Sequence, residues 1–207
     1  QSANVTSTNG LEPGDSRAVF KTVNVDMRQY KKLRMFLHAE AIEAATDNTR
    51  LKDDELVAFI RFGNDFTNNF YQVEIPLKVT EWGKTFSEDI WPLANEIELQ
   101  LELLTKLKLL RNKDINQNSN FIYFKNEEEL DPNLATKINK LRLGVKGNPN
   151  FGLVRTIMVG VRNNTKKIYE ETSVIPKDVR GEVWFNELRM SDMTNKGGGA
   201  ANAHLDA

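Results

Sequence analysis

Cysteine is absent from this chain of 207 residues, and histidine occurs only twice, at His38 and His204. Thiolate nucleophiles, iron–sulfur clusters and cysteine-ligated zinc are therefore excluded, and a zinc site made of several histidines is nearly so. Net charge is also small, because 28 Lys and Arg face 29 Asp and Glu and leave a formal charge of −1. No broad basic field is present to hold nucleic acid or anionic lipid. The composition argues against a nucleic-acid-binding protein.

Long apolar runs are missing as well. Charged residues interrupt every hydrophobic stretch before it reaches the roughly 20 residues of a membrane helix. Hydrophobic residues nevertheless make up 40% of the chain and charged residues 28%, which is ordinary globular usage. A chain of this length can bury enough surface to fold without disulfides or a metal ion. The sequence therefore predicts a globular, soluble fragment without a transmembrane segment.

Both ends of the chain are polar and carry few structural signals. The chain starts at Gln1 without the features of a signal peptide, and three glycines follow Lys196 near its end. We therefore expect a module of a longer protein. The predicted organisation is a flexible lead-in over residues 1–17, a single β-sandwich domain over residues 18–192, and a flexible tail or junction over residues 193–207.

Short runs of alternating hydrophobic and polar residues, separated by turn residues, begin at Ala18. A period of two predicts strands that present one face to a core. Pro76 cannot donate to a ladder, so its strand should end there or lie at a sheet edge. Gly147 to Asn150 has the composition of a tight turn between two strands. The predicted strands cover residues 32–39, 56–62, 71–77, 121–124, 140–146, 154–162 and 182–188.

One segment is helical in character. Residues 101–111 are rich in leucine and contain no Gly or Pro, and residues 97–101 alternate just before them, so a strand should run into a helix. Leu103, Leu104, Leu107 and Leu110 form the predicted apolar stripe. We expect this accessory helix, around 101–111, to pack over a sheet edge or an end of the sandwich.

Many short strands with one helix favour an all-β fold. The specific expectation is an antiparallel two-sheet β-sandwich, jelly-roll-like and similar to carbohydrate-binding modules. Because alternation presents one face of each strand to the partner sheet, the side chains on that face should be buried. The predicted buried residues are Leu33, Met35, Leu37, Ala58, Ile60, Val73, Ile75, Val159 and Phe185.

The segment WPLANEIELQ, from Trp91 to Gln100, resembles the active-site strand of laminarinase-type glycoside hydrolases. Such enzymes place a nucleophilic carboxylate about 5 Å from an acid/base carboxyl group. Glu96 matches the nucleophile and Glu98 replaces an Asp, but the acid/base position falls on Gln100 or Leu101. Neither of these side chains can deliver a proton. The segment therefore favours a solvated strand face over a hydrolase.

A metal site and a catalytic histidine have equally weak support. The opening spacing of Asp114 to Asn118 is that of a calcium loop, but Ser119 replaces the turn glycine and Lys125 replaces the bidentate Glu. His38 lies on a predicted strand face, where a hydrogen-bonded or exposed histidine is more common than a catalytic base. We assign no catalytic, metal-binding or cofactor-binding residue, and we expect no cofactor.

Aromatic residues offer one candidate surface. Trp82, Trp91 and Tyr71, together with Trp184 and Tyr123, could form a flat platform on which a sugar or a partner stacks. Large aromatics also dominate ordinary cores, each burying 150–250 Å². Both interpretations stay open at this point, and Trp82, Trp91 and Tyr71 are the candidate carbohydrate or partner surface.

Five blocks in order resemble the SprA/Sov family. They are VDMRQYKKLRMFLHAE (Val25 to Glu40), FIRFGNDFTNNFYQVEIPL (Phe59 to Leu77), IWPLANEIELQLELLTKLKLLRN (Ile90 to Asn112), GVRN (Gly160 to Asn163) and GEVWFNELRMSDMTNKGG (Gly181 to Gly198).

Members of that family are very large outer-membrane proteins of Bacteroidota, needed for type IX secretion and, in gliding species, for motility. The resemblance implies that this chain is one soluble domain of a translocon, on the periplasmic or cell-surface side of the outer membrane. It further implies a non-catalytic role and contacts with other parts of the parent protein and with secretion-system proteins. A carbohydrate-binding module is the alternative, and a degenerate laminarinase-like hydrolase is a third, weaker one.

Overall fold

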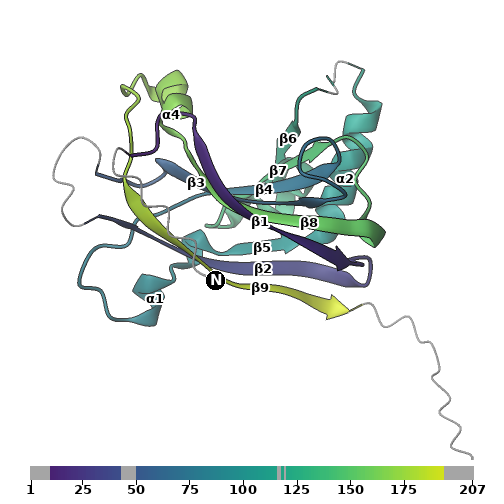
Figure 1. The fold of residues 1–207 in the computed structure, drawn as a ribbon, viewed down its shortest axis with the longest axis horizontal. Helices are drawn as coiled ribbons and strands as arrows, with labels where there is room; N and C mark the ends of the chain where they lie inside the picture. The colour runs from purple at the N-terminus through teal and green to yellow at the C-terminus, as the bar shows by residue number, and fades with distance from the viewer. Residues whose placement is uncertain (1–9, 43–49, 116–117, 119, 194–207) are drawn as a thin grey trace, which may run out of the picture.

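The computed structural model describes residues 10–42, 50–115, 118 and 120–193 of the chain. Over these residues the chain forms two antiparallel sheets that lie one above the other (Figure 1). This confirms the predicted all-β, two-sheet sandwich. The strands are divided unequally between the sheets, six to three.

The larger sheet has the strand order β1-β8-β3-β4-β7-β6, and the smaller sheet has the order β5-β2-β9. All seven strand pairs are antiparallel. The strand bounds are β1 Ser16–Val25, β2 Tyr30–Ala41, β3 Leu56–Gly63, β4 Phe70–Pro76, β5 Ile97–Gln100, β6 Tyr123–Asn126, β7 Arg142–Lys146, β8 Val154–Asn163 and β9 Gly181–Met193.

Short helices fill the connections. The α-helices are α1 Ser87–Ile90, α2 Leu101–Lys113, α3 Glu127–Leu130 and α4 Thr165–Thr172, and the 3₁₀ turns are η1 Leu93–Asn95, η2 Pro132–Thr136 and η3 Phe151–Leu153. Only α2 is longer than ten residues among them. It follows β5 directly and packs against β2, β5, β6 and β7, so it closes the sandwich on that side.

The buried leucine stripe of α2 begins one leucine earlier than predicted and also ends one leucine earlier. Leu103, Leu104 and Leu107 are fully buried as expected, and Leu101 joins them at 4% exposure. The prediction for Leu110 is wrong, because its side chain is 43% exposed. The stripe runs from the start of the helix to Leu107. In the last turn Arg111 takes over the contact face, where its guanidinium donates to the Gly147 carbonyl, and Arg111 and Lys113 interact favourably with the helix dipole.

Seven of the nine predicted core residues are buried to 3% or less: Leu33, Met35, Leu37, Ala58, Ile60, Val73 and Ile75. The other two, Val159 on β8 and Phe185 on β9, pack against the core but are only partly buried. Val159 lies on β8, which is next to the edge strand β1, and Phe185 lies on β9, which is itself an edge strand. Alternation identifies the inward face correctly but gives no measure of how completely the opposite sheet covers it.

Two local features follow the sequence closely. Pro76 ends β4, and the pairing of β4 with β7 stops two residues earlier at Glu74, so the missing N–H interrupts no hydrogen bond to β7. Gly147 begins the turn between β7 and β8 with φ +60°, a left-handed conformation that favours glycine. The backbone N–H of Asn148 then donates to the Asn69 side chain at 2.9 Å, which joins this turn to the β3–β4 loop.

Ordered packing starts before position 18. Leu11 is 5% exposed, and its backbone N–H donates to the Val179 carbonyl at 2.9 Å. β1 begins at Ser16. Although this segment is polar in composition, its Leu11 is buried and forms an antiparallel bridge to Val179, which is far away in the sequence.

Candidate functional site

The three aromatic residues singled out as a possible binding surface do not share a face. Tyr71 is 3% exposed on the inner face of β4 and stacks on Phe151, with ring centroids 4.8 Å apart. Trp82 follows β4, is 49% exposed, and its indole Nε1 donates to the Ala41 carbonyl at 2.8 Å. Trp91 follows α1 and is partly buried. Tyr71 therefore belongs to the core and cannot stack on a ligand.

Trp91 and Trp184 meet at His38 on the outer face of the smaller sheet. The imidazole centroid of His38 lies 5.9 Å from the Trp91 ring and 5.4 Å from the Trp184 ring. His38 is 4% exposed, and its Nδ1 donates to the Ile90 carbonyl at 2.7 Å. It is thus a hydrogen-bonded strand histidine that anchors the end of α1. Tyr123, on the inward face of β6, packs against the core instead.

Glu96, the residue at the hydrolase nucleophile position, is engaged in an ion pair. It is 4% exposed, and Arg34 on β2 donates from Nε to its carboxylate at 2.6 Å. This hydrogen bond raises the pKa of Arg34. Glu98 pairs with Arg34 across the β2–β5 ladder, while Gln100 ends β5 and Leu101 is buried at the start of α2. The segment is a charged ladder against β2, and it brings no proton donor to Glu96.

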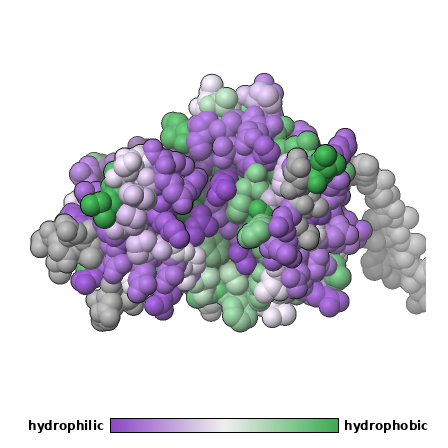
Figure 2. All heavy atoms as spheres, turned by 90° about the horizontal axis from the view of Figure 1, so that it is seen from above, coloured by the Kyte–Doolittle hydropathy of each residue, from purple (hydrophilic) through white to green (hydrophobic). Residues whose placement is uncertain are grey.

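Sequence reasoning missed a buried charge network on the outer face of the larger sheet. Glu74, at 2% exposure, accepts hydrogen bonds from Arg162 at 2.8 and 3.0 Å, from Arg142 at 3.5 Å and from Gln72 at 2.6 Å. Burial opposes ionisation, but the two guanidinium groups outweigh it and lower the pKa of Glu74. Arg142 is further held 4.0 Å above the Phe124 ring. Figure 2 views the molecule from this side, which is mostly hydrophilic and hollowed near its middle.

A second missed acid lies close to the hydrolase-like segment. Glu127, at 0% exposure, and Glu98 line one recess of about 420 Å³. Burial raises the pKa of Glu127, against the lowering effect of Lys137, whose Nζ donates to its carboxylate at 2.9 Å. An acid with a raised pKa next to a second carboxylate is the arrangement found in the active site of a glycosidase. Here both carboxylate oxygens of Glu127 are engaged within the protein, Oε1 by the backbone N–H of Leu141 and Oε2 by Lys137, which favours a structural role.

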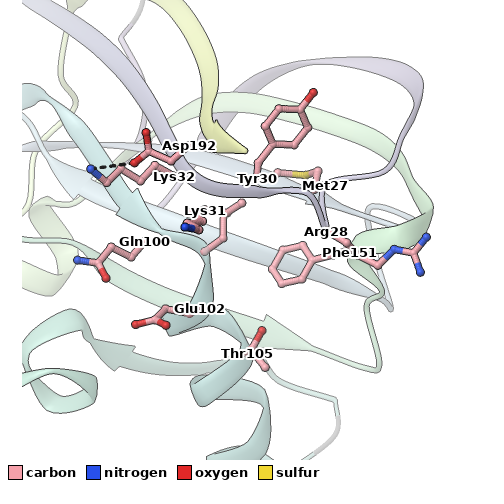
Figure 3. Close-up of a pocket in the computed structure, with 11 residues that line it drawn as sticks. Met27, Arg28, Tyr30, Lys31, Lys32, Gln100, Glu102, Thr105, Phe151 and Asp192 are labelled. Atoms are coloured by element: carbon pink, nitrogen blue, oxygen red, sulfur yellow. Dashed lines mark ion pairs between the residues drawn. The ribbon is translucent and has the colours of Figure 1, made fainter. Parts of the chain in front are cut away.

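Another recess, with both apolar and charged walls, lies at one end of the sandwich (Figure 3). It has a volume of about 430 Å³ and is framed by the β1–β2 turn, the start of α2, Phe151 and the end of β9. Its apolar walls come from Met27, Tyr30 and Phe151, and an ion pair of 3.1 Å between Lys32 and Asp192 crosses its rim. Such a recess suits an amphipathic side chain or small molecule. It brings together no pair of unpaired carboxylates.

Part of the calcium-like loop lies outside the described residues, namely positions 116, 117 and 119. Within the described ranges, no three side chains of His, Cys, Asp or Glu gather as metal ligands would. Lys125, at the position of the expected bidentate Glu, forms an ion pair with Glu129 at 2.7 Å. No described helix combines the length and hydrophobicity that crossing a membrane requires.

Comparison with known families assigns the chain. No protein with curated function matches its sequence. The family model SprA_N, described as motility related/secretion protein, matches residues 1–207, which is the whole chain. It is a family of secretion and motility proteins and not a known enzyme family. The match agrees with the five sequence blocks, and the chain therefore belongs to the SprA_N family of motility-related and secretion proteins.

Proposed function

We propose that this chain is a non-catalytic structural and interaction domain of a very large outer-membrane translocon, serving type IX protein secretion and gliding motility in Bacteroidota. In that role it contacts other parts of its parent protein and other secretion-system proteins, on the periplasmic or cell-surface side of the outer membrane. The family match supports the secretion and motility part of the proposal.

The observation that carries the non-catalytic part concerns the buried acids. Four glutamates are buried among the described residues, and each one is paired with a cation, which in three of the four pairs comes from a distant segment. Glu74 pairs with Arg162, Glu96 with Arg34, Glu127 with Lys137, and Glu55 with Lys177 at 2.9 Å. Breaking a buried pair is costly, and its partners are fixed in place. These acids join distant segments of the fold and are not available to react.

A deletion within the parent protein tests the role in secretion. Removing residues 10–193 in frame, in a gliding species that carries this protein, is expected to abolish both cargo secretion and gliding. Restoring the wild-type residues should rescue both phenotypes, and immunoblotting should show that the shortened parent protein still reaches the outer membrane. Normal secretion by a stable, correctly located deletion variant would contradict the proposal.

A glucan assay tests the absence of hydrolase chemistry. The purified chain is expected to release no reducing sugar from β-1,3-glucan or mixed-linkage glucan, because Gln100 and Leu101 cannot donate a proton. Glu96→Gln, which keeps the size of the side chain, is the control and should be equally inactive. Turnover that this substitution abolishes would establish a hydrolase instead.

Carbohydrate binding is the second candidate function, favoured by the exposed indole faces of Trp82 and Trp184. Their side chains are 49% and 39% exposed, and aromatic faces of this kind stack on sugar rings. Calorimetric titration with soluble glucans and with cell-surface polysaccharide tests it directly. Binding that is lost in both Trp82→Ala and Trp184→Ala would favour this candidate, while heat changes at the level of buffer dilution for the wild type would reject it.

A further inference from the structure

Over the described residues the two sheets present four edge strands, and β1 is the least protected of them. Exposed edges pair with other strands unless they are short, covered, bulged or charged. β5 and β6 have four residues each and lie against α2. β9 is long, but its pairing register to β2 shifts between Arg34 and Phe36, and Glu187 and Asp192 have positive φ angles of 54° and 58°. Such a bulge twists an edge away from potential partners.

β1 carries two edge cations, Arg17 and Lys21, and its register with β8 shifts after Thr22, but the strand before that shift forms a regular edge. Its seven residues Ser16 to Thr22 pair with β8 in an unbroken register, without proline and without a positive φ angle. Its other edge borders no strand of the sheet. Val19 and Phe20 are 51% and 65% exposed. A regular, partly apolar edge of seven residues is an arrangement that accepts an added strand.

The core is also open on this side of the sandwich. α2 closes the side of β5, β6 and β7, whereas β1 and β9 lie on the other side (Figure 1). We call the inward-facing apolar residues there the β1–β9 seam. Five of them are partly buried against the core, and the sixth, Val19, is 51% exposed. The seam consists of Val19, Val23, Ile157, Val159, Phe185 and Met190.

The charges on β1 indicate which residues an added strand would carry. Arg17 and Lys21 lie two residues on either side of Val19, so all three side chains share the inward face of β1. Both cations are exposed, and among the described residues neither has an acidic partner. Opposite charges directly across a ladder stabilise strand pairing. A strand that fits β1 therefore has an apolar residue opposite Val19 and an acidic residue on each side of it.

We propose that β1 accepts an extended segment of a partner protein with the pattern acidic-x-apolar-x-acidic, which adds antiparallel to the larger sheet and covers the β1–β9 seam. This inference rests on the proposed function, because it specifies how the domain meets the rest of the secretion machinery. Backbone hydrogen bonds would supply much of the affinity, and the charge pattern would set the register.

A synthetic peptide probe tests this proposal on the 207-residue chain. The fluorescein-labelled peptide Thr-Glu-Tyr-Ile-Thr-Glu-Thr, aligned antiparallel to β1, places Ile opposite Val19 and its two glutamates opposite Arg17 and Lys21. We expect saturable binding in fluorescence anisotropy with a Kd below about 1 mM. Amide resonance shifts in nuclear magnetic resonance spectra should be confined to β1 and its seam.

Charge exchange provides the matched controls. The double variant Arg17→Glu with Lys21→Glu should weaken binding about tenfold. The same variant should bind the peptide in which both glutamates are replaced by lysine. Lys84→Glu with Lys113→Glu reverses two exposed lysines elsewhere and should leave the affinity unchanged.

Three results would overturn the inference: no saturation by 1 mM peptide, equal binding of the acidic and basic peptides to the wild type, or shifts centred outside β1 and its seam. Self-association through β1 in sedimentation experiments would replace the partner segment with a second copy of the chain. None of these outcomes bears on the deletion phenotype, so the proposed function would fail only if secretion persisted without the domain.

Discussion

Glu74→Gln is expected to lower the free energy of unfolding by about 3–5 kcal/mol, the cost of breaking a buried ion pair by removing one partner. The side chain is 3% exposed, and its carboxylate faces two arginines, Arg162 at 2.8 Å and Arg142 at 3.5 Å. The amide keeps the size of the side chain but leaves both guanidinium groups without a counter-charge. Urea denaturation at pH 7, monitored by tryptophan fluorescence, measures the change. A loss below about 1 kcal/mol would show that the network contributes little.

The pH dependence of the unfolding free energy distinguishes the contribution of this ion pair from that of side-chain packing. The folded pKa of Glu74 is lowered, so its stabilisation is fully present above the unfolded pKa of about 4.3 and is lost as pH falls through the folded pKa. The wild type should therefore lose its advantage over Glu74→Gln as the solution becomes more acidic than about pH 4.

Glu127 supplies a control of opposite sign. Its folded pKa is raised, so the folded state holds its proton more tightly and stability falls as pH rises from about 4.3 toward the folded pKa. Relative to the wild type, Glu127→Gln should therefore gain stability over that interval. The same pH trend for both variants would contradict these opposite assignments.

The fold could be predicted because its signals are local. Alternation in β2, β3 and β4 identified inward residues such as Met35, Ile60 and Val73, all buried here. Where the prediction was only partly correct, at Val159 and Phe185, the missing information was tertiary. The sequence of a strand indicates which of its faces is apolar. Whether the opposite sheet extends far enough to cover that face depends on how the two sheets are arranged. The exposure of Leu110 has a tertiary cause as well, since in the last turn of α2 it is Arg111 that faces the protein and donates to the Gly147 carbonyl.

The site was harder to predict because pairing between distant residues has no local signal. Glu74 alternates with Val73 and Ile75, so the sequence suggests a solvated outer face, yet Arg162 lies 88 positions away and seals it. Tyr71 shows the opposite difficulty. An aromatic residue on a strand can belong either to an exposed binding surface or to the buried core, and the sequence alone does not distinguish the two. For Glu96 the sequence predicts only that no proton donor stands beside it in the segment, and the pairing that the structure adds, with Arg34, comes from β2 and not from the segment itself.

Leu107→Ala is expected to lower the free energy of unfolding by about 2–5 kcal/mol, the range for buried leucines whose removal leaves a cavity. The Leu107 side chain is fully buried in the core cluster, on the face by which α2 contacts β7 and β2. α2 closes only one side of the sandwich, so few other side chains can move into the space. The matched control is Leu110→Ala, one turn further along the same helix, where the side chain is 43% exposed and the loss should stay within about 0.5 kcal/mol. Both variants have the same change in helix propensity, so the difference between them in urea denaturation isolates burial. Equal losses would show that α2 contributes through its helicity and not through the packing that closes this side of the fold.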